Sequence, residues 1–234
     1  MNQAVTNRRG PGPYELLIGA VDWSPEGACV GYYDDGTPEE WQLCYYSNMH
    51  RAVMLSSGQW RSAGAELCQQ WLEDVDPGFV FVPELDEECI ELLIRGQSLP
   101  MTALDHLADH IIGIVAVPTT EQLANPGWIK PLLETSSLTV ILPASQSTDE
   151  MVRQSVCTHG ASVAWIADDT DEPESCGDFL LAISQATDSR RQREIIARLD
   201  HWMGEARQAV LLFEGPGAAR SAEQARTIAE LMGV

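Results

Sequence analysis

The run HIIGIVAVP, residues 110–118, decides the predicted fold. Its aliphatic residues follow one another without the polar alternation of a strand that has one face in water. A strand of this kind is buried on both faces, as in a parallel sheet covered by helices. Because parallel strands need long crossover connections, the sequence on either side of this run should alternate between strands and helices.

Seven further segments have the same character. The predicted strands cover residues 15–21, 51–56, 78–84, 137–144, 161–168, 178–185 and 208–215. Segments with apolar residues at helical spacing separate most of them, for example 62–75, 148–160 and 189–207. Eight strands in this order predict an α/β fold, a TIM-barrel-like (β/α)8 barrel in a single domain. An open, doubly wound parallel sheet is the alternative, because it gives a similar alternation.

We expect residues 1–13 to form a flexible N-terminal arm, because two arginines and GPGP occur there without a sustained apolar run. The barrel domain then covers residues 14–234. The longest strongly apolar run, 111–117, is far shorter than the roughly 20 residues that a membrane helix needs. Six cysteines without a C-x-x-C pair favour reduced thiols and a cytoplasmic location.

The chain is strongly acidic: 35 Asp and Glu residues face 14 Lys and Arg residues, which gives a formal net charge of -21. A surface of this charge repels phosphate backbones and anionic membranes. We therefore expect neither nucleic acid nor a membrane as partner. The expected partner is a small molecule or another protein.

In a (β/α)8 barrel the chemistry takes place at the carboxyl ends of the strands. Four of the predicted strand ends carry a carboxylate, at Asp22, Glu84, Asp168 and Glu214. Converging carboxylates can act as a general acid and a general base, which makes these four the catalytic candidates. Ordinary loop acids are the alternative, because Asp and Glu make up 35 of the 234 residues.

A glycine-rich turn, FEGPGAARS at 213–221, joins the last strand to the last helix. Free backbone N–H groups at a helix start attract anions, so Gly215, Gly217 and Arg220 are predicted to bind a phosphate or carboxylate. Gly and Pro are also ordinary turn residues, and Glu214 would oppose an anion. A P-loop is excluded because no G-K-[ST] follows.

An aromatic-rich segment, 22–50, separates the first two strands. We expect it to lie over the mouth of the barrel, where Trp23, Trp41, Tyr45 and Tyr46 are candidate ligand-binding residues. These rings could stack on a sugar or a base, or close the barrel end as a plug, which is the interpretation that we favour. No third ligand accompanies the His106 and His110 pair, so neither a metal nor a cofactor is predicted.

Four stretches resemble motifs of the YecE-like bacterial family, known as domain of unknown function 72 (DUF72). They are residues 18–23 (IGAVDW), 41–48 (WQLCYYSN), 79–81 (FVF) and 213–225 (FEGPGAARSAEQA). The resemblance implies a TIM-barrel-like fold over nearly the whole chain.

The departures from the family's pattern fall on its polar residues. RAVML at 51–55 replaces a Glu-x-Asn pair in the second strand, and no lysine follows the F-x-F strand near Pro83. The resemblance therefore implies a non-catalytic binding or interaction module that has lost the family's polar centre. The alternative is a hydrolase or isomerase that uses the four carboxylates on a sugar-like or phosphorylated small molecule.

Overall fold

The computed structural model describes residues 16–99, 102–143, 145–146, 149–168, 172–173, 176–204 and 207–234. The predicted arm, 1–13, lies outside these ranges. Within them, no helix combines the length and the apolarity that crossing a membrane requires.

Nine strands form one sheet in the order β6-β5-β4-β3-β2-β1-β9-β8-β7. All neighbouring strands that pair are parallel. The strands are β1 (Leu17–Ala20), β2 (Ala52–Leu55), β3 (Val80–Leu85), β4 (Ile114–Ala116), β5 (Leu138–Val140), β6 (Ser162–Val163), β7 (Trp165–Ile166), β8 (Phe179–Ser184) and β9 (Gln208–Phe213). The run quoted first contains β4, in the middle of one half of the sheet.

The two ends of the sheet meet in one short segment. β6 pairs with β5 and β7 pairs with β8, and only Ala164 separates β6 from β7. The backbone N–H of Ala164 donates to the carbonyl of Val140 at 2.8 Å, which continues the pairing with β5. The sheet is therefore a nearly closed barrel, and the predicted strand 161–168 is this bent pair. The TIM-barrel-like prediction is confirmed, and the open-sheet alternative is wrong.

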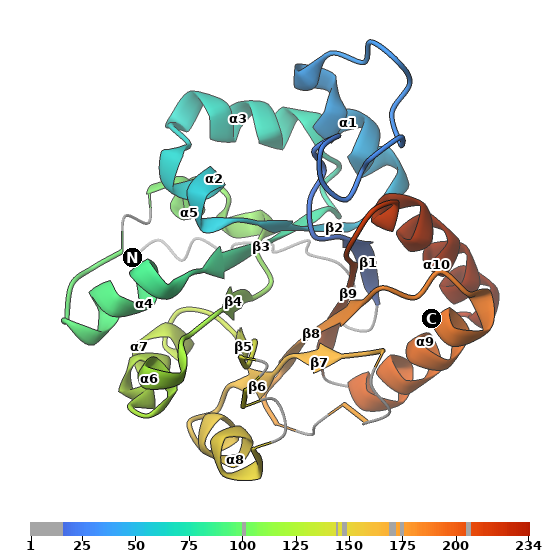
Figure 1. Ribbon diagram of the computed structural model, residues 1–234. Coiled ribbons are helices and arrows are strands. Elements are labelled where there is room, and N and C mark those ends of the chain that lie inside the picture. The colour runs from blue at the N-terminus through green and yellow to red at the C-terminus, as the bar shows by residue number, and fades with distance from the viewer. Residues whose placement is uncertain are drawn as a thin grey trace, which may run out of the picture.

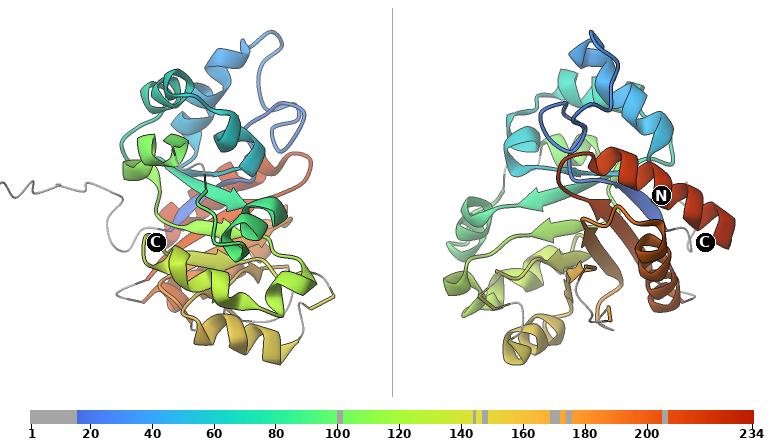
Figure 2. Two further views of the ribbon diagram at one scale, coloured as in Figure 1. Left: turned by 90° about the vertical axis from the view of Figure 1, so that its left-hand side faces the viewer. Right: turned by 45° about the vertical axis from the view of Figure 1, so that its right-hand side comes forward.

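Helices surround the strands, as Figure 1 and Figure 2 show. They are α1 (Glu39–Met49), α2 (Ser57–Ser62), α3 (Ala65–Asp74), α4 (Glu87–Ile94), α5 (Thr102–His106), α6 (Thr120–Leu123), α7 (Ile129–Leu133), α8 (Glu150–Thr158), α9 (Ser189–Met203) and α10 (Ala218–Met232), with short 3-10 turns η1 (Ala108–His110) and η2 (Pro126–Trp128). Thr119 caps α6, because its side chain accepts from the backbone N–H of Gln122.

Apolar side chains fill two layers. Successive residues of a strand point to opposite faces, so alternate side chains enter the barrel and the others lie beneath the helices. The inner cluster contains Leu17, Val82, Phe179, Val210 and Leu212, among others. The outer cluster includes Ile18, Phe81, Ile90, Ile195 and Leu211. The barrel is thus a packed core and not a pore.

The segment between β1 and β2 holds a helix that sequence periodicity does not reveal. In α1, Leu43 and Tyr46 are buried, whereas Trp41 and Tyr45 are 64% and 47% exposed. Large apolar residues on both faces leave no single stripe from which a helix could be recognised. The segment is therefore a crossover element of the barrel as well as a loop.

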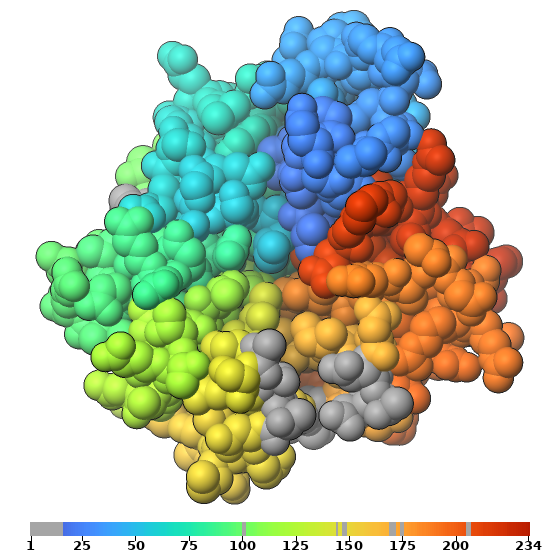
Figure 3. Space-filling model, viewed as in Figure 1, coloured from blue at the N-terminus to red at the C-terminus, as the bar shows by residue number. Residues whose placement is uncertain are grey.

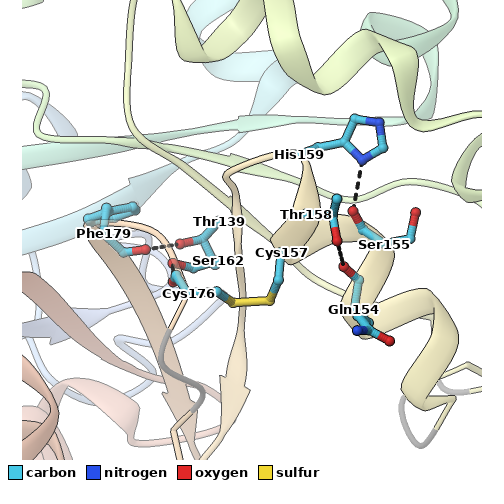
Figure 4. Close-up of a disulfide and its surroundings, with 9 residues drawn as sticks. All are labelled: Thr139, Gln154, Ser155, Cys157, Thr158, His159, Ser162, Cys176 and Phe179. Carbon is cyan, nitrogen blue, oxygen red and sulfur yellow. Dashed lines mark hydrogen bonds between the residues drawn. A yellow bond between two sulfur atoms is a disulfide. The ribbon is translucent and has the colours of Figure 1, made fainter.

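Cys157 and Cys176 form a disulfide, which corrects the expectation that all cysteines are reduced thiols. Their Cα atoms are 5.4 Å apart, and the bond joins the last turn of α8 to the segment before β8 (Figure 4). Nearby, Ser162 Oγ donates to the carbonyl of Cys176, and Thr139 Oγ1 donates to that of Phe179 at 2.9 Å. The two cysteines are 19 residues apart, so only the fold brings them together.

Candidate functional site

Apolar side chains line part of the mouth that the carboxyl ends of the strands surround. Val21, Met54, Val117 and Ile141 are partly buried and pack against the cluster inside the barrel. Val21, Val117 and Ile141 directly follow β1, β4 and β5, and Met54 is the last residue but one of β2, so all four lie toward the same end of the barrel. These four positions therefore present hydrophobic surface beside the polar residues at the other strand ends.

Asp22 hydrogen-bonds within its own loop. Its carboxylate accepts from the backbone N–H of Ser24 at 3.0 Å and from the Ser24 hydroxyl. A carboxylate that binds the backbone two residues further along is the usual organiser of a tight turn. The geometry thus gives Asp22 a role in holding the start of the segment that follows β1.

Glu84 stands on β3, where its side chain is half-buried. Burial raises the pKa of its carboxyl, and the charge of Asp86 raises it further. Its backbone carbonyl accepts from the indole N–H of Trp60 at 2.9 Å, while its carboxylate makes no hydrogen bond within the described ranges. Strands β2 and β1 separate it from β9, which ends at the Glu214 loop.

Asp168 and Glu214 are linked through Gln185. Asp168 accepts from the hydroxyl of Ser184 at 3.0 Å and from the backbone N–H of Gln185 at 2.5 Å. The side-chain amide of Gln185 then donates to Glu214 at 2.9 Å. The structure therefore brings two of the four predicted carboxylates into one network. Gln185 gives no signal in the sequence, because an uncharged amide after a strand resembles any loop residue.

The glycine-rich turn begins α10 as predicted, with Gly215 and Gly217 both at positive φ. The backbone N–H of Ala219 donates to the carbonyl of Ala28 at 3.1 Å. Arg220 donates to the carbonyl of Gly31 at 2.6 Å. Figure 3 shows the blue segment after β1 lying against the red start of α10. Groups expected to bind an anion thus hold the 22–38 segment, and anion binding by Gly215, Gly217 and Arg220 stays a prediction.

The four predicted aromatic residues do not form one platform over the mouth. Tyr46 is fully buried in the outer layer, between α1 and the strands, and Trp41 lies on the exposed side of the same helix. Tyr45 contacts Tyr32 and Tyr33 edge to face, with ring centroids 5.9 Å and 5.7 Å apart. The expectation that these rings close the barrel end is therefore corrected: Tyr46 fixes α1 to the sheet, and Tyr45 fixes the preceding loop to α1.

Trp23 borders a groove beside the mouth. Its ring centroid is 6.0 Å from that of Trp71 on α3, in an edge-to-face contact. The groove has a volume of about 570 Å³ and extends between the segment after β1 and helices α1 and α3. Sequence reasoning singled out Trp23 but missed Gln42 and Trp71, because amphipathic helix positions do not reveal which loop they will face.

The sequence matches no family model, and no curated protein matches it significantly. Solved structures match the barrel. A DUF72 family protein from Thermotoga maritima has a TM-score of 0.65 at 14% identity, with 92% of this chain and 99% of that chain covered. The chain has the DUF72 barrel fold.

A DUF72 family protein from Enterococcus faecalis agrees, with a TM-score of 0.64 at 13% identity and coverage of 94% of this chain and 96% of that one. At these identities the likeness establishes the fold alone. It confirms, at the level of fold, the resemblance to DUF72 that the sequence motifs predict. Activity has to be argued from the residues of this barrel itself.

Proposed function

We propose that this chain is a non-catalytic binding protein built on the DUF72 barrel fold, and that its ligand is a small molecule bound near the carboxyl ends of the strands. The observation that carries the proposal is that three of the four candidate catalytic carboxylates already make hydrogen bonds within the protein. Asp22 organises its own turn, and Asp168 and Glu214 hold Ser184 and Gln185. These carboxylates therefore serve the architecture of the loops.

Acid–base catalysis needs two groups, held close to one substrate and driven to different protonation states by their surroundings. Glu84 has no such partner among the other three candidates, which make their hydrogen bonds elsewhere. The strand-end residues Met54 and Val117 are apolar and add no group that would stabilise charge in a transition state. Both features support binding without turnover.

One observation favours the alternative, a hydrolase or isomerase acting on a sugar-like or phosphorylated substrate. A half-buried carboxyl whose pKa is raised by burial, as at Glu84, is the form that a general acid takes. This alternative makes Glu84 indispensable. The two functions therefore differ in what a substitution at this residue does.

The test combines binding and turnover. Sugars, sugar phosphates and chromogenic glycosides are screened by thermal shift, since a ligand that binds the native state raises Tm, and the same compounds are assayed for conversion. We expect a rise in Tm without conversion. Conversion that Glu84→Gln abolishes, while the exposed control Glu87→Gln retains it, would replace the proposal by the enzyme alternative.

Location and partner class are part of the same proposal. A net charge of -21 supports a small molecule or protein partner in place of nucleic acid. A cytoplasmic location is proposed on the four free cysteines, Cys29, Cys44, Cys68 and Cys89, because a reducing compartment keeps thiols free. Counting the thiols of the protein isolated from its host tests this location.

A further inference from the structure

A groove beside the barrel mouth combines residues from three parts of the chain. It lies between the segment after β1 and helices α1 and α3, which Figure 1 shows next to each other outside the strands. Its volume of about 570 Å³ falls within the range of about 300 to 1,000 Å³ that is typical of small-molecule sites. All of its lining residues belong to the described ranges.

Carboxylates dominate the charge of this groove. Glu26, Glu39, Glu40 and Asp74 line it, and none of its lining residues is Lys, Arg or His. The described residues contain no group of three or more His, Cys, Asp or Glu side chains placed to hold a metal ion. The carboxylates are therefore spread along the groove and do not converge on one point, which suits an organic cation better than a metal.

The position of Asp74 is electrostatically unfavourable. It is the last residue of α3, where the partial negative charge of the helix end disfavours a carboxylate. Burial raises the pKa of this carboxyl, and the charge of neighbouring Glu73 adds to the effect. Glu39 and Glu40, by contrast, lie in the first turn of α1, where a helix favours acids. Helix electrostatics thus explain two of the groove's carboxylates and not Asp74.

Gln42 gives an independent sign of a ligand. It is only 8% exposed and lines the groove, yet its side-chain amide makes no hydrogen bond to any described residue. Trp71 is 7% exposed, and its indole N–H likewise has no hydrogen-bond partner in the described ranges. Neither group belongs to the fully buried, unpartnered side-chain atoms of the described residues. Both therefore open onto the groove, where a ligand that carries hydrogen-bonding groups can bind them.

The remaining wall is apolar. The paired rings of Trp23 and Trp71, with Leu43 and Leu67, face the same space. Indole faces attract cations as well as carbon skeletons, because their quadrupole is negative over the ring. Acid, amide and indole groups therefore occur together in one groove of suitable size.

We infer that this groove binds a small organic amine that also carries hydroxyl or carbonyl groups. Glu39, Glu40 and Asp74, spread along the groove, attract the ammonium group by their negative charge. Gln42 and Trp71 hydrogen-bond the polar substituents of the ligand, and Trp23 packs on its carbon skeleton. The inference rests on the proposed non-catalytic binding function. It adds the chemical class of the ligand and the place where the ligand binds.

Glucosamine and glucose are the probes, because they share their hydroxyl groups and differ by the ammonium. Binding is measured by titration calorimetry and by Tm in dilute buffer and in added salt. We expect glucosamine to bind at least about ten-fold more tightly than glucose, and salt to weaken it through screening. Circular dichroism and Tm of each unliganded variant confirm that it is folded.

Matched variants locate the site. Glu39→Gln with Glu40→Gln should weaken glucosamine about five-fold or more, and Gln42→Met about five-fold. Asp34→Asn with Asp35→Asn removes the same charge from exposed positions outside the groove, so binding should stay within about two-fold. Glu84→Gln, at the barrel mouth, should leave it unchanged.

The inference is overturned if glucosamine does not bind, or if the Asp34 and Asp35 pair matters as much as the Glu39 and Glu40 pair. Loss of binding in Glu84→Gln alone would move the ligand to the mouth and leave the binding function standing. Turnover of any compound overturns the proposed function instead, and does so whether or not the groove variants bind.

Discussion

The hydroxyl of Tyr46 donates a hydrogen bond to the backbone carbonyl of Ala52 at 2.9 Å. The same oxygen accepts from the backbone N–H of Ala20 at 2.6 Å. Ala20 ends β1 and Ala52 begins β2, so one side chain of α1 joins two neighbouring parallel strands from outside the barrel. Because Tyr46 is fully buried, no water replaces this hydroxyl if it is removed.

Tyr46→Phe should therefore lower the free energy of unfolding by about 1 to 3 kcal/mol, the usual consequence of leaving a buried backbone group without its partner. Chemical denaturation followed by circular dichroism measures the change. Tyr45→Phe removes the same atom from the half-exposed neighbour and should stay within about 0.5 kcal/mol. Equal effects of the two substitutions would contradict the bridging role.

His50 should make the protein sensitive to acid. Both ring nitrogens are buried and have no hydrogen-bond partner among the residues that the structure describes. The ring lies against Tyr46 and Tyr32, with centroids 4.3 Å and 5.6 Å away. Burial, and then the charge of Arg226, lowers its pKa from 6.5 to about 3. The unfolded chain thus binds a proton between these values while the folded chain does not. The contribution of neutral His50 to stability is therefore complete above pH 6.5 and is lost as the pH falls toward 3.

For each pH unit in this range, His50 lowers the free energy of unfolding by at most about 1.4 kcal/mol. Unfolding free energies measured from pH 7 to pH 4 should fall less steeply in His50→Phe than in the parent chain. The carboxylates are common to both proteins, so the difference in slope isolates the histidine. Parallel curves would show that His50 is already protonated or exposed in the native state.

The raised pKa of Glu84 predicts the opposite dependence of stability on pH. Its pKa is raised in the folded state, so its contribution to stability is present below the ordinary pKa of 4.5 and is lost as pH rises through the folded value. Glu84→Gln should raise Tm at pH 7, and the gain should shrink near pH 4. Glu87→Gln, at an exposed position in the first turn of α4, should give no such gain. A lower Tm at neutral pH would mean that the charged form of Glu84 has a stabilising partner.

The disulfide predicts a thiol count. Of six cysteines, Cys29, Cys44, Cys68 and Cys89 are free and only Cys44 is exposed. A thiol reagent should therefore react with one cysteine in the native protein, four after denaturation, and six after denaturation with reduction. Six without reduction would mean that Cys157 and Cys176 are thiols, as the sequence alone suggested.

Removing the bond should also destabilise the fold. A closed loop of this size limits the unfolded chain and contributes about 3 kcal/mol on the chain-entropy model. Cys157→Ser with Cys176→Ser should lower the free energy of unfolding by up to that amount, whereas Cys44→Ser should leave it nearly unchanged. Denaturation in the absence of reductant measures both.

Much of the architecture could be predicted from the sequence, because local pattern and composition determine it. The unbroken apolar run at 110–118 requires burial on both faces, and eight such segments separated by helical patterns lead to a barrel. Thr119 shows its helix start by residue type alone. Helix α1 was not predicted, because aromatic residues on both of its faces leave no single apolar stripe.

The candidate site could be predicted only in part. The strand ends are fixed by the order of elements, so Asp168 and Glu214 could be named from the sequence. Their link through Gln185 depends on the register between β8 and β9, which no local pattern encodes. In the same way, Trp23 was visible as an aromatic after a strand, whereas Gln42 and Asp74 meet it only because α1 and α3 pack side by side.

The sequence by itself thus determined the strands, most of the helices and the barrel, since each follows from hydrophobic periodicity over a few neighbouring residues. Only the tertiary structure decided which polar groups are satisfied, that Cys157 meets Cys176, and that carboxylates from α1 and α3 share one groove. These relationships join residues far apart along the chain, and they exist only once packing has fixed the distances and the burial of their side chains.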